Sequence, residues 1–136
     1  TSFRWVPNGI PGVGARLIIL FSEGVMKGRI SLEQFVALTA TSHARIYGLY
    51  PRKGSIAIGA DADIAIWDPK ISYTLTHDLI QDGSDYTPYE GFELTGRPVL
   101  TMSRGTVIMR DGELVGHKGH GIYLPRARSP YANTLR

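Results

Sequence analysis

Residues 54–69 read Gly-Ser-Ile-Ala-Ile-Gly-Ala-Asp-Ala-Asp-Ile-Ala-Ile-Trp-Asp-Pro, and they set the character of the C-terminal half. Two short Ile-rich runs, 56–58 and 64–67, flank a tight acidic turn. Short apolar runs bounded by Gly and Asp are typical of β-strands. Because proline has no amide hydrogen for a ladder, we expect the second strand to end at Pro69. The stretch therefore predicts a hairpin.

The strand pattern continues toward the C-terminus. Strands are predicted at 55–58, 63–68, 71–76, 98–104, 106–110 and 113–115. Asp111-Gly112 is typical of the two-residue turn of a hairpin. The polar and aromatic segment 77–97 predicts a long loop, and loops of that length are functional or pack against another element. The tail after Gly116 has few apolar anchors, so we expect it to be extended or disordered unless a partner orders it.

The N-terminal part predicts two helices. Residues 13–27 place apolar side chains at i, i+4, i+7 and i+8, the spacing of one helical face. Ser31 and Gln34 have the spacing of a capping box, which predicts a second helix over residues 32–47. Gly48 then suits the left-handed position that follows a helix.

The composition indicates a globular fold and excludes several classes of protein. The chain has 136 residues, of which 43% are hydrophobic and 20% charged. The longest apolar run, 17–21, is too short to span a bilayer. The absence of cysteine excludes thiolate metal sites and disulfides, and favours a cytoplasmic location. The formal charge of +3, without a basic cluster interleaved with aromatic residues, gives nucleic-acid binding little support.

Two observations predict that the chain is a C-terminal fragment of a longer protein. The sequence begins at Thr1 rather than Met and continues without a leader. Two helices and a small β-rich unit also cannot bury their apolar faces alone. A mature, processed chain is the alternative.

The chemistry-bearing side chains form no catalytic pattern. The four histidines form neither His-x-His nor His-Glu-x-x-His, and no serine lies in Gly-x-Ser-x-Gly. His43 is expected to pack on a helix with one nitrogen satisfied, and His117 and His120 could form at most a weak metal site. Asp61 and Asp63 could act as paired acids, but capping of turns is the favoured interpretation.

The segment 7–12, Pro-Asn-Gly-Ile-Pro-Gly, is dense in turn residues. A fixed loop that carries Asn8 and free backbone amides can bind the amide or imide edge of a ring, which requires both a donor and an acceptor. From the residues alone, a turn without a ligand is the favoured alternative.

Several motifs together resemble the C-terminal third of dihydropyrimidinases and D-hydantoinases. They include Pro7-Asn8-Gly9-Ile10-Pro11-Gly12, Tyr47-Gly48-Leu49-Tyr50-Pro51-Arg52-Lys53-Gly54, Gly59-Ala60-Asp61-Ala62-Asp63 and Asp85-Tyr86-Thr87-Pro88-Tyr89-Glu90-Gly91. The similarity covers roughly residues 6–125. The Gly-Ala-Asp-Ala-Asp motif is shared broadly with metal-dependent amidohydrolases, whereas the first and last motifs are more specific to the hydantoinase branch. Gly14 and Ala15 stand where relatives often carry an acid and a hydroxyl residue.

The resemblance implies an α/β fold: the C-terminal end of a (β/α)8 TIM barrel and the C-terminal part of a small β-sandwich. Residues 1–50 would be the last barrel loop and its helices. Residues 51–115 would be the C-terminal part of the β-sandwich. The tail, 116–136, would reach a neighbouring subunit of a homotetramer.

The resemblance also implies an activity, the hydrolytic opening of cyclic amides such as 5,6-dihydropyrimidines and hydantoins. A water bridged between two zinc ions would attack, and all zinc ligands would lie upstream of Thr1. This chain would then hold no catalytic and no metal-binding residue, and would be inactive alone. Asn8 would be its one substrate-binding residue, largely through the backbone.

Two rival functions stay open. The first is a non-catalytic, dihydropyrimidinase-related assembly or scaffold protein, because such relatives lose the metal ligands. The second is a free-standing β-rich binding module, which is disfavoured because its two helices would lack cover.

Overall fold

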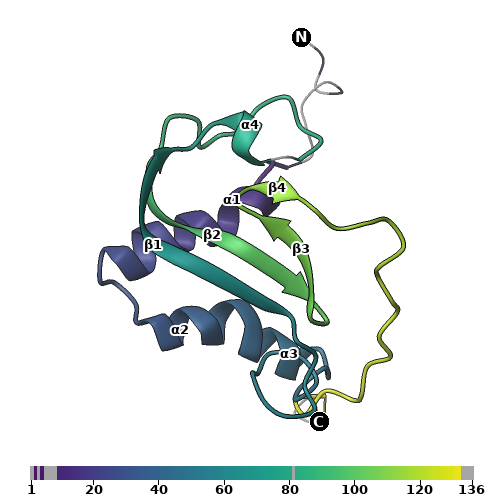
Figure 1. Cartoon of the computed structure of the whole chain (residues 1–136). Helices are drawn as coiled ribbons and strands as arrows, with labels where there is room; N and C mark the ends of the chain where they lie inside the picture. The colour runs from purple at the N-terminus through teal and green to yellow at the C-terminus, as the bar shows by residue number, and fades with distance from the viewer. Residues whose placement is uncertain (1, 3, 5–8, 81, 133–136) are drawn as a thin grey trace.

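The structure is a computed structural model that describes residues 2, 4, 9–80 and 82–132. In chain order the elements are α1 (Val13–Ile19), η2 (Leu20–Met26), α2 (Leu32–Val36), η3 (Ala37–Thr41), α3 (Ser42–Ile46), β1 (Ile64–Thr74), α4 (His77–Ile80), β2 (Glu93–Ser103), β3 (Thr106–Arg110) and β4 (Glu113–Leu114). The strands form one antiparallel sheet in the order β1-β2-β3-β4. Figure 1 shows the helix of α1 and η2 crossing behind β1 and β2.

The two predicted helices are confirmed. The first runs through α1 and η2, and the second runs through α2, η3 and α3. The capping box is present: the Gln34 amide donates to Ser31 Oγ at 3.2 Å, and the Ser31 amide donates to Gln34 Oε1 at 2.8 Å. Gly48 follows with a φ of 69°. No helix in the described ranges has the length and apolar character needed to cross a membrane.

The prediction that a strand ends at Pro69 is wrong. The segments predicted at 63–68 and 71–76 are one strand, β1, and Pro69 lies inside it. The pairing of β1 with β2 is irregular between Asp68 and Ser72. β1 is also an edge strand of the described sheet. The missing amide hydrogen of Pro69 therefore costs no ladder bond, as is usual for proline at edges and bulges.

The prediction of a strand at 55–58 is also wrong, because those residues lie in turns and bends. Ile56 is 86% exposed, and the Ala60 amide donates to the Ala57 carbonyl at 3.0 Å. A strand requires a neighbour to pair with, and no described strand pairs with this segment. The Gly-Ala-Asp-Ala-Asp motif is consequently a turn that leads into β1 rather than a hairpin.

The two hairpin turns that flank β3 follow from local chemistry. Asp111 and Gly112 join β3 to β4 with φ angles of 51° and 90°, which confirms the predicted hairpin. Arg104 and Gly105 join β2 to β3 with φ angles of 47° and 78°. Positive φ at both central residues is the geometry of the hairpin turns that match strand twist. β2 begins at Glu93, five residues before its predicted start at 98.

The helices pack directly on the sheet through an aromatic cluster of Phe21, Phe35 and Trp67. Phe21 stacks on Trp67 with 4.5 Å between ring centroids, and Phe35 meets both rings edge-on. Gly96 of β2 has a φ of 85°, and a Cβ there would lie 2.4 Å from Cε1 of Phe21. The ring of Phe21 therefore occupies the space that a side chain would need. A second core joins Ala15, Leu75 and Leu94.

Residues 116–132 of the tail form turns and irregular backbone, and they contact their own chain. The Ala127 amide donates to the Gly48 carbonyl at 2.9 Å. The Gly116 amide donates to the Ile108 carbonyl at 3.0 Å, and a ring nitrogen of His120 lies 3.1 Å from the Ser103 carbonyl. These bonds tie the tail to both the end of the second helix and the sheet.

Candidate functional site

The loop predicted to bind a ring leads into the start of α1. Asn8, its predicted binding residue, lies outside the described residues. Gly9 has a φ of 128°, and Ile10 is 68% exposed. Gly12 is the N-cap of α1, and its carbonyl accepts from the Arg16 amide at 2.9 Å. The described part of this loop therefore presents backbone groups at the surface while its last residue is fixed by the helix.

The long polar loop packs over the first turn of α1. We call residues 76–80 and 82–91 the acidic loop. Its two ends are joined, because the Gly91 amide donates to the Leu75 carbonyl at 2.9 Å. Ile80 and Tyr89 pack against the core that contains Ala15. The expectation that this loop packs against another element is confirmed, and the contacted element is α1, the helix that follows the segment predicted to bind a ring.

A hollow of about 330 Å3 lies on the acidic loop. It is lined by Thr76, His77, Asp78, Asp85, Tyr86, Thr87 and Glu90. The carboxylate of Glu90 accepts from the His77 amide at 2.7 Å, and a ring nitrogen of His77 contacts the Ser84 carbonyl. The side chain of Asp82 accepts from the Ser84 amide at 3.0 Å, as is usual for an aspartate in a turn. These bonds shape the loop from within.

Asp61 and Asp63 of the Gly-Ala-Asp-Ala-Asp motif form an ion-pair cluster with Arg52 and Lys53. Lys53 Nζ lies 2.9 Å from Asp61 Oδ2 and also contacts the Asp63 carboxylate. Arg52 Nε donates to Asp61 Oδ2 at 3.0 Å. Asp63 Oδ1 accepts from the Arg104 amide at 2.8 Å, which ties the motif to the turn between β2 and β3.

The electrostatics of this cluster agree with a structural role. Hydrogen bonding from Lys53 and then from Arg52 lowers the pKa of Asp61. Burial opposes ionisation of Asp63, yet the bonds from Lys53 and from the Arg104 amide outweigh it and lower the pKa of Asp63. Burial of Lys53 likewise acts to lower its pKa, but the two carboxylates raise it overall. All three groups are therefore held in their charged forms. None of them is poised to donate or accept a proton near neutral pH.

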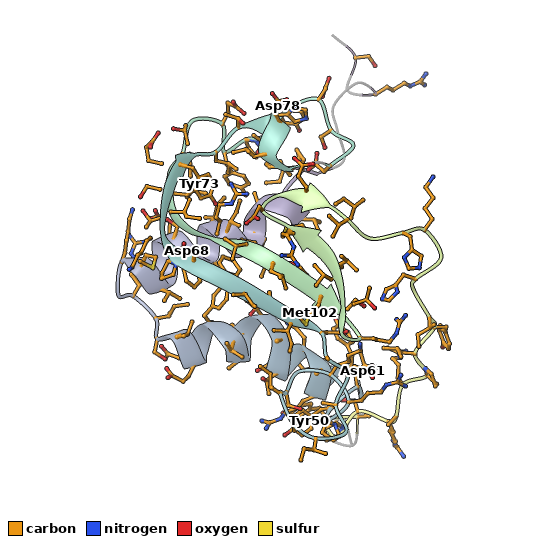
Figure 2. All side chains as sticks on the ribbon, in the orientation of Figure 1. Tyr50, Asp61, Asp68, Tyr73, Asp78 and Met102 are labelled. Atoms are coloured by element: carbon orange, nitrogen blue, oxygen red, sulfur yellow. The ribbon has the colours of Figure 1, made fainter. Side chains whose placement is uncertain are left out.

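Figure 2 shows that these two polar regions lie at opposite ends of the molecule. Asp61 lies beside Tyr50 near the end of α3, whereas Asp78 of the acidic loop lies beyond the other end of the sheet. The two groups of carboxylates therefore do not converge on one site.

The other predicted candidates also have structural contacts. The ring of His43 stacks on Tyr47 with 6.4 Å between centroids, and the rings of His117 and His120 meet at 5.6 Å. The buried Ser22 hydroxyl accepts from the Thr95 amide at 3.0 Å. Within the described ranges, no group of three or more His, Asp or Glu side chains is placed to hold a metal ion.

Comparison with known proteins relates this geometry to a family. A model described as "Amidohydrolase family" matches residues 15–108. The chain is 46% identical to a D-hydantoinase from Geobacillus stearothermophilus over 126 residues, and 49% identical to a D-phenylhydantoinase from Escherichia coli over 124 residues. These alignments cover 93% and 91% of this chain, which spans only 27% of the length of each relative.

Solved structures show the same relationship. A D-hydantoinase from a Bacillus sp. AR9 superposes with a TM-score of 0.87 at 47% identity, covering 92% of this chain and 28% of the solved chain. The two helices, the antiparallel sheet and the acidic loop therefore have counterparts within a much longer polypeptide.

Proposed function

Because the chain belongs to the amidohydrolase family, we propose that the complete protein is a hydantoinase or dihydropyrimidinase and that this chain is its C-terminal part. The reaction is the hydrolytic opening of a cyclic amide, either a hydantoin or a 5,6-dihydropyrimidine. The observation that carries the proposal is the 46–49% identity to D-hydantoinase and D-phenylhydantoinase, which extends over more than nine-tenths of the chain.

In this proposal Asn8 contacts the amide edge of the substrate ring through its backbone. An amide edge presents one donor and one acceptor, so a backbone N–H and C=O in a fixed loop complement it. Gly12 anchors the described end of this loop to α1. That anchor supports the proposal, because a binding loop needs one end held rigidly.

The two zinc ions of the proposed reaction do not fit the residues described here. No metal-holding group of three or more side chains occurs among residues 9–80 and 82–132. We therefore assign the zinc ligands and the attacking water to the rest of the complete protein. This chain contributes binding and support, and by itself it is inactive.

The proposed architecture joins this chain to a (β/α)8 barrel through residues 1–50 and to a β-sandwich through residues 51–115. Residues 116–136 are proposed to reach a neighbouring subunit of a homotetramer in the cytoplasm. The exposure of Ile122 and Tyr123, at 56% and 88%, supports a partner for the tail, because such side chains gain by burial.

The test is an assay of the complete protein with 5-phenylhydantoin and with dihydrouracil. We expect ring opening of at least one of them and none by residues 1–136 alone, even with added zinc. An N8P variant should raise KM, because proline removes the backbone donor and fixes φ. No turnover by the metal-loaded complete protein would overturn the proposal and favour the scaffold alternative.

A further inference from the structure

Ile80 of the acidic loop fills the space beside Gly14 in the first turn of α1. A Cβ at Gly14 would lie 2.4 Å from Cγ2 of Ile80 and 3.1 Å from the Ile80 carbonyl oxygen. Real side chains do not approach that closely, so the close contact depends on glycine at this position. The close approach of the acidic loop to α1 at this point therefore requires glycine at position 14.

Tyr89 lies near the same turn, in the other half of the acidic loop. Its hydroxyl would be 3.9 Å from a Cβ built at Gly12, so it faces Gly12 and leaves room for no more than a methyl group. The Tyr89 ring meets the Phe92 ring edge-on at 5.7 Å between centroids. Both Ile80 and Tyr89 are half-buried and pack on the core of Ala15, Leu75 and Leu94. Tyr89 therefore sits on a rigid base.

The acidic loop is itself braced, so it can act as a support. The Leu75 amide donates to the Phe92 carbonyl at 2.8 Å, and the Gly91 amide donates to the Leu75 carbonyl at 2.9 Å. The His77 amide bond to Glu90 joins the two halves of the loop. Figure 1 shows α4, which ends at Ile80, close to the start of α1.

We propose that Ile80 and Tyr89 are positioning residues for substrate binding. They hold Gly12 and Gly14, and so fix the segment that directly follows Asn8 in the sequence. This inference rests on the proposed function, because it assigns to the acidic loop the support of the ring-binding segment. It gives the Asp-Tyr-Thr-Pro-Tyr-Glu-Gly motif a physical role that does not involve contact with the substrate.

The test moves side-chain volume from position 80 to position 14 in the complete protein. I80A leaves a gap beside Gly14, and G14A places a methyl group against Ile80. Each single variant should raise KM for 5-phenylhydantoin or dihydrouracil by about tenfold with kcat unchanged, which is the result expected when ground-state and transition-state binding weaken equally. In the double variant the added methyl occupies the vacated space, so KM should return toward its original value.

Further variants separate positioning from general loss of stability. L79A removes a similar volume one residue earlier from a side chain that is 47% exposed, and it should leave KM unchanged. Y89F keeps the ring but removes the hydroxyl that faces Gly12, so it should raise KM less than Y89A does. Loss of kcat without a change in KM in I80A would overturn the inference.

Hydrogen exchange of the amides of Gly9, Ile10 and Gly12 gives a readout that needs no turnover. I80A should speed their exchange, and the double variant should slow it again. If exchange responds in this way but the unmodified protein opens neither ring, positioning holds and the proposed function fails. If neither exchange nor KM responds in a protein that does turn over, the positioning inference fails and the proposed function stands.

Discussion

The aromatic cluster and the ion-pair cluster both join segments that are distant in the sequence, but they do so through different interactions. The aromatic cluster joins both helices to the sheet through ring contacts at 4.5–5.6 Å. The ion-pair cluster joins the segment before β1 to the turn after β2 through charges that are partly exposed, with Lys53 at 20% and Asp63 at 36%. Burial of large rings stabilises far more than partly solvated charge pairs do.

The comparison shows that the Gly-Ala-Asp-Ala-Asp motif, one of those that carry the family resemblance, contributes less to the stability of the fold than the aromatic cluster does. Asp61 and Asp63 belong to the recognisable motif, yet their contacts are the weaker kind. Phe21 and Phe35 belong to ordinary helical patterns and carry the tighter packing. The following predictions test this ranking, and each is to be measured on the complete protein.

Phe21→Ala should cause the largest loss of stability. The ring is 4% exposed and contacts both Phe35 and Trp67, so its removal leaves a cavity and should cost about 3–5 kcal/mol. Denaturant unfolding and amide exchange in β1 and β2 measure the effect. Phe92→Ala is the matched control, because Phe92 is 45% exposed. An equal loss in both variants would contradict the ranking.

The elements that could be predicted from the sequence are those fixed by neighbouring residues. The capping box of Ser31 and Gln34 acts within one helical turn, and Asp111-Gly112 sets its hairpin through its own φ angles. The predictions at Pro69 and at 55–58 failed because they depend on distant partners. Whether a strand continues past proline depends on its pairing register with β2. That register cannot be predicted from the residues next to the proline.

The candidate site could be predicted only in part for the same reason. The motif that contains Asn8 indicated a ring-binding loop, although that residue lies outside the described range. The support by Ile80 could not be predicted, because 66 positions separate it from Gly14 and only the fold brings them together. A glycine in the first turn of the predicted helix, where glycine disfavours helix, was the one available signal.

Gly96→Ala should cause the second largest loss and would test the shape of the aromatic cluster. An alanine at φ 85° costs about 1–2 kcal/mol in backbone strain, and its Cβ would also displace the Phe21 ring. Gly91→Ala is a close control, because Gly91 has a φ of 83° with no atom within 4 Å of its added Cβ. Thermal unfolding should show a larger loss for Gly96→Ala. Equal losses would mean that strain alone, and not packing, decides the cost.

Lys53→Met should cause a smaller loss, about 0.5–1 kcal/mol, as is usual for partly exposed ion pairs. The substitution keeps the length of the side chain and removes the charge between Asp61 and Asp63. Unfolding should be compared at low salt and in 1 M NaCl, where screening should reduce the difference. Lys70→Met serves as the control from an exposed lysine in β1. A loss for Lys53→Met as large as that for Phe21→Ala would reverse the ranking of the two regions.

The smallest effect should appear at low pH, in the acid limb of the curve of unfolding free energy against pH. The pKa of Asp61 is lowered in the folded protein by Lys53 and Arg52, so the folded state binds its proton less readily than the unfolded state does. The resulting stability is present above the ordinary Asp pKa of about 4 and is lost as pH falls through the lower folded pKa. Asp61→Asn should therefore lose this small stabilisation at pH 7 and match the unmodified protein at the lowest pH, so that its stability falls less steeply below about pH 4. A steeper acid limb in Asp61→Asn would show that the cluster opposes folding, and the contrast with the aromatic cluster would then be one of sign rather than of size.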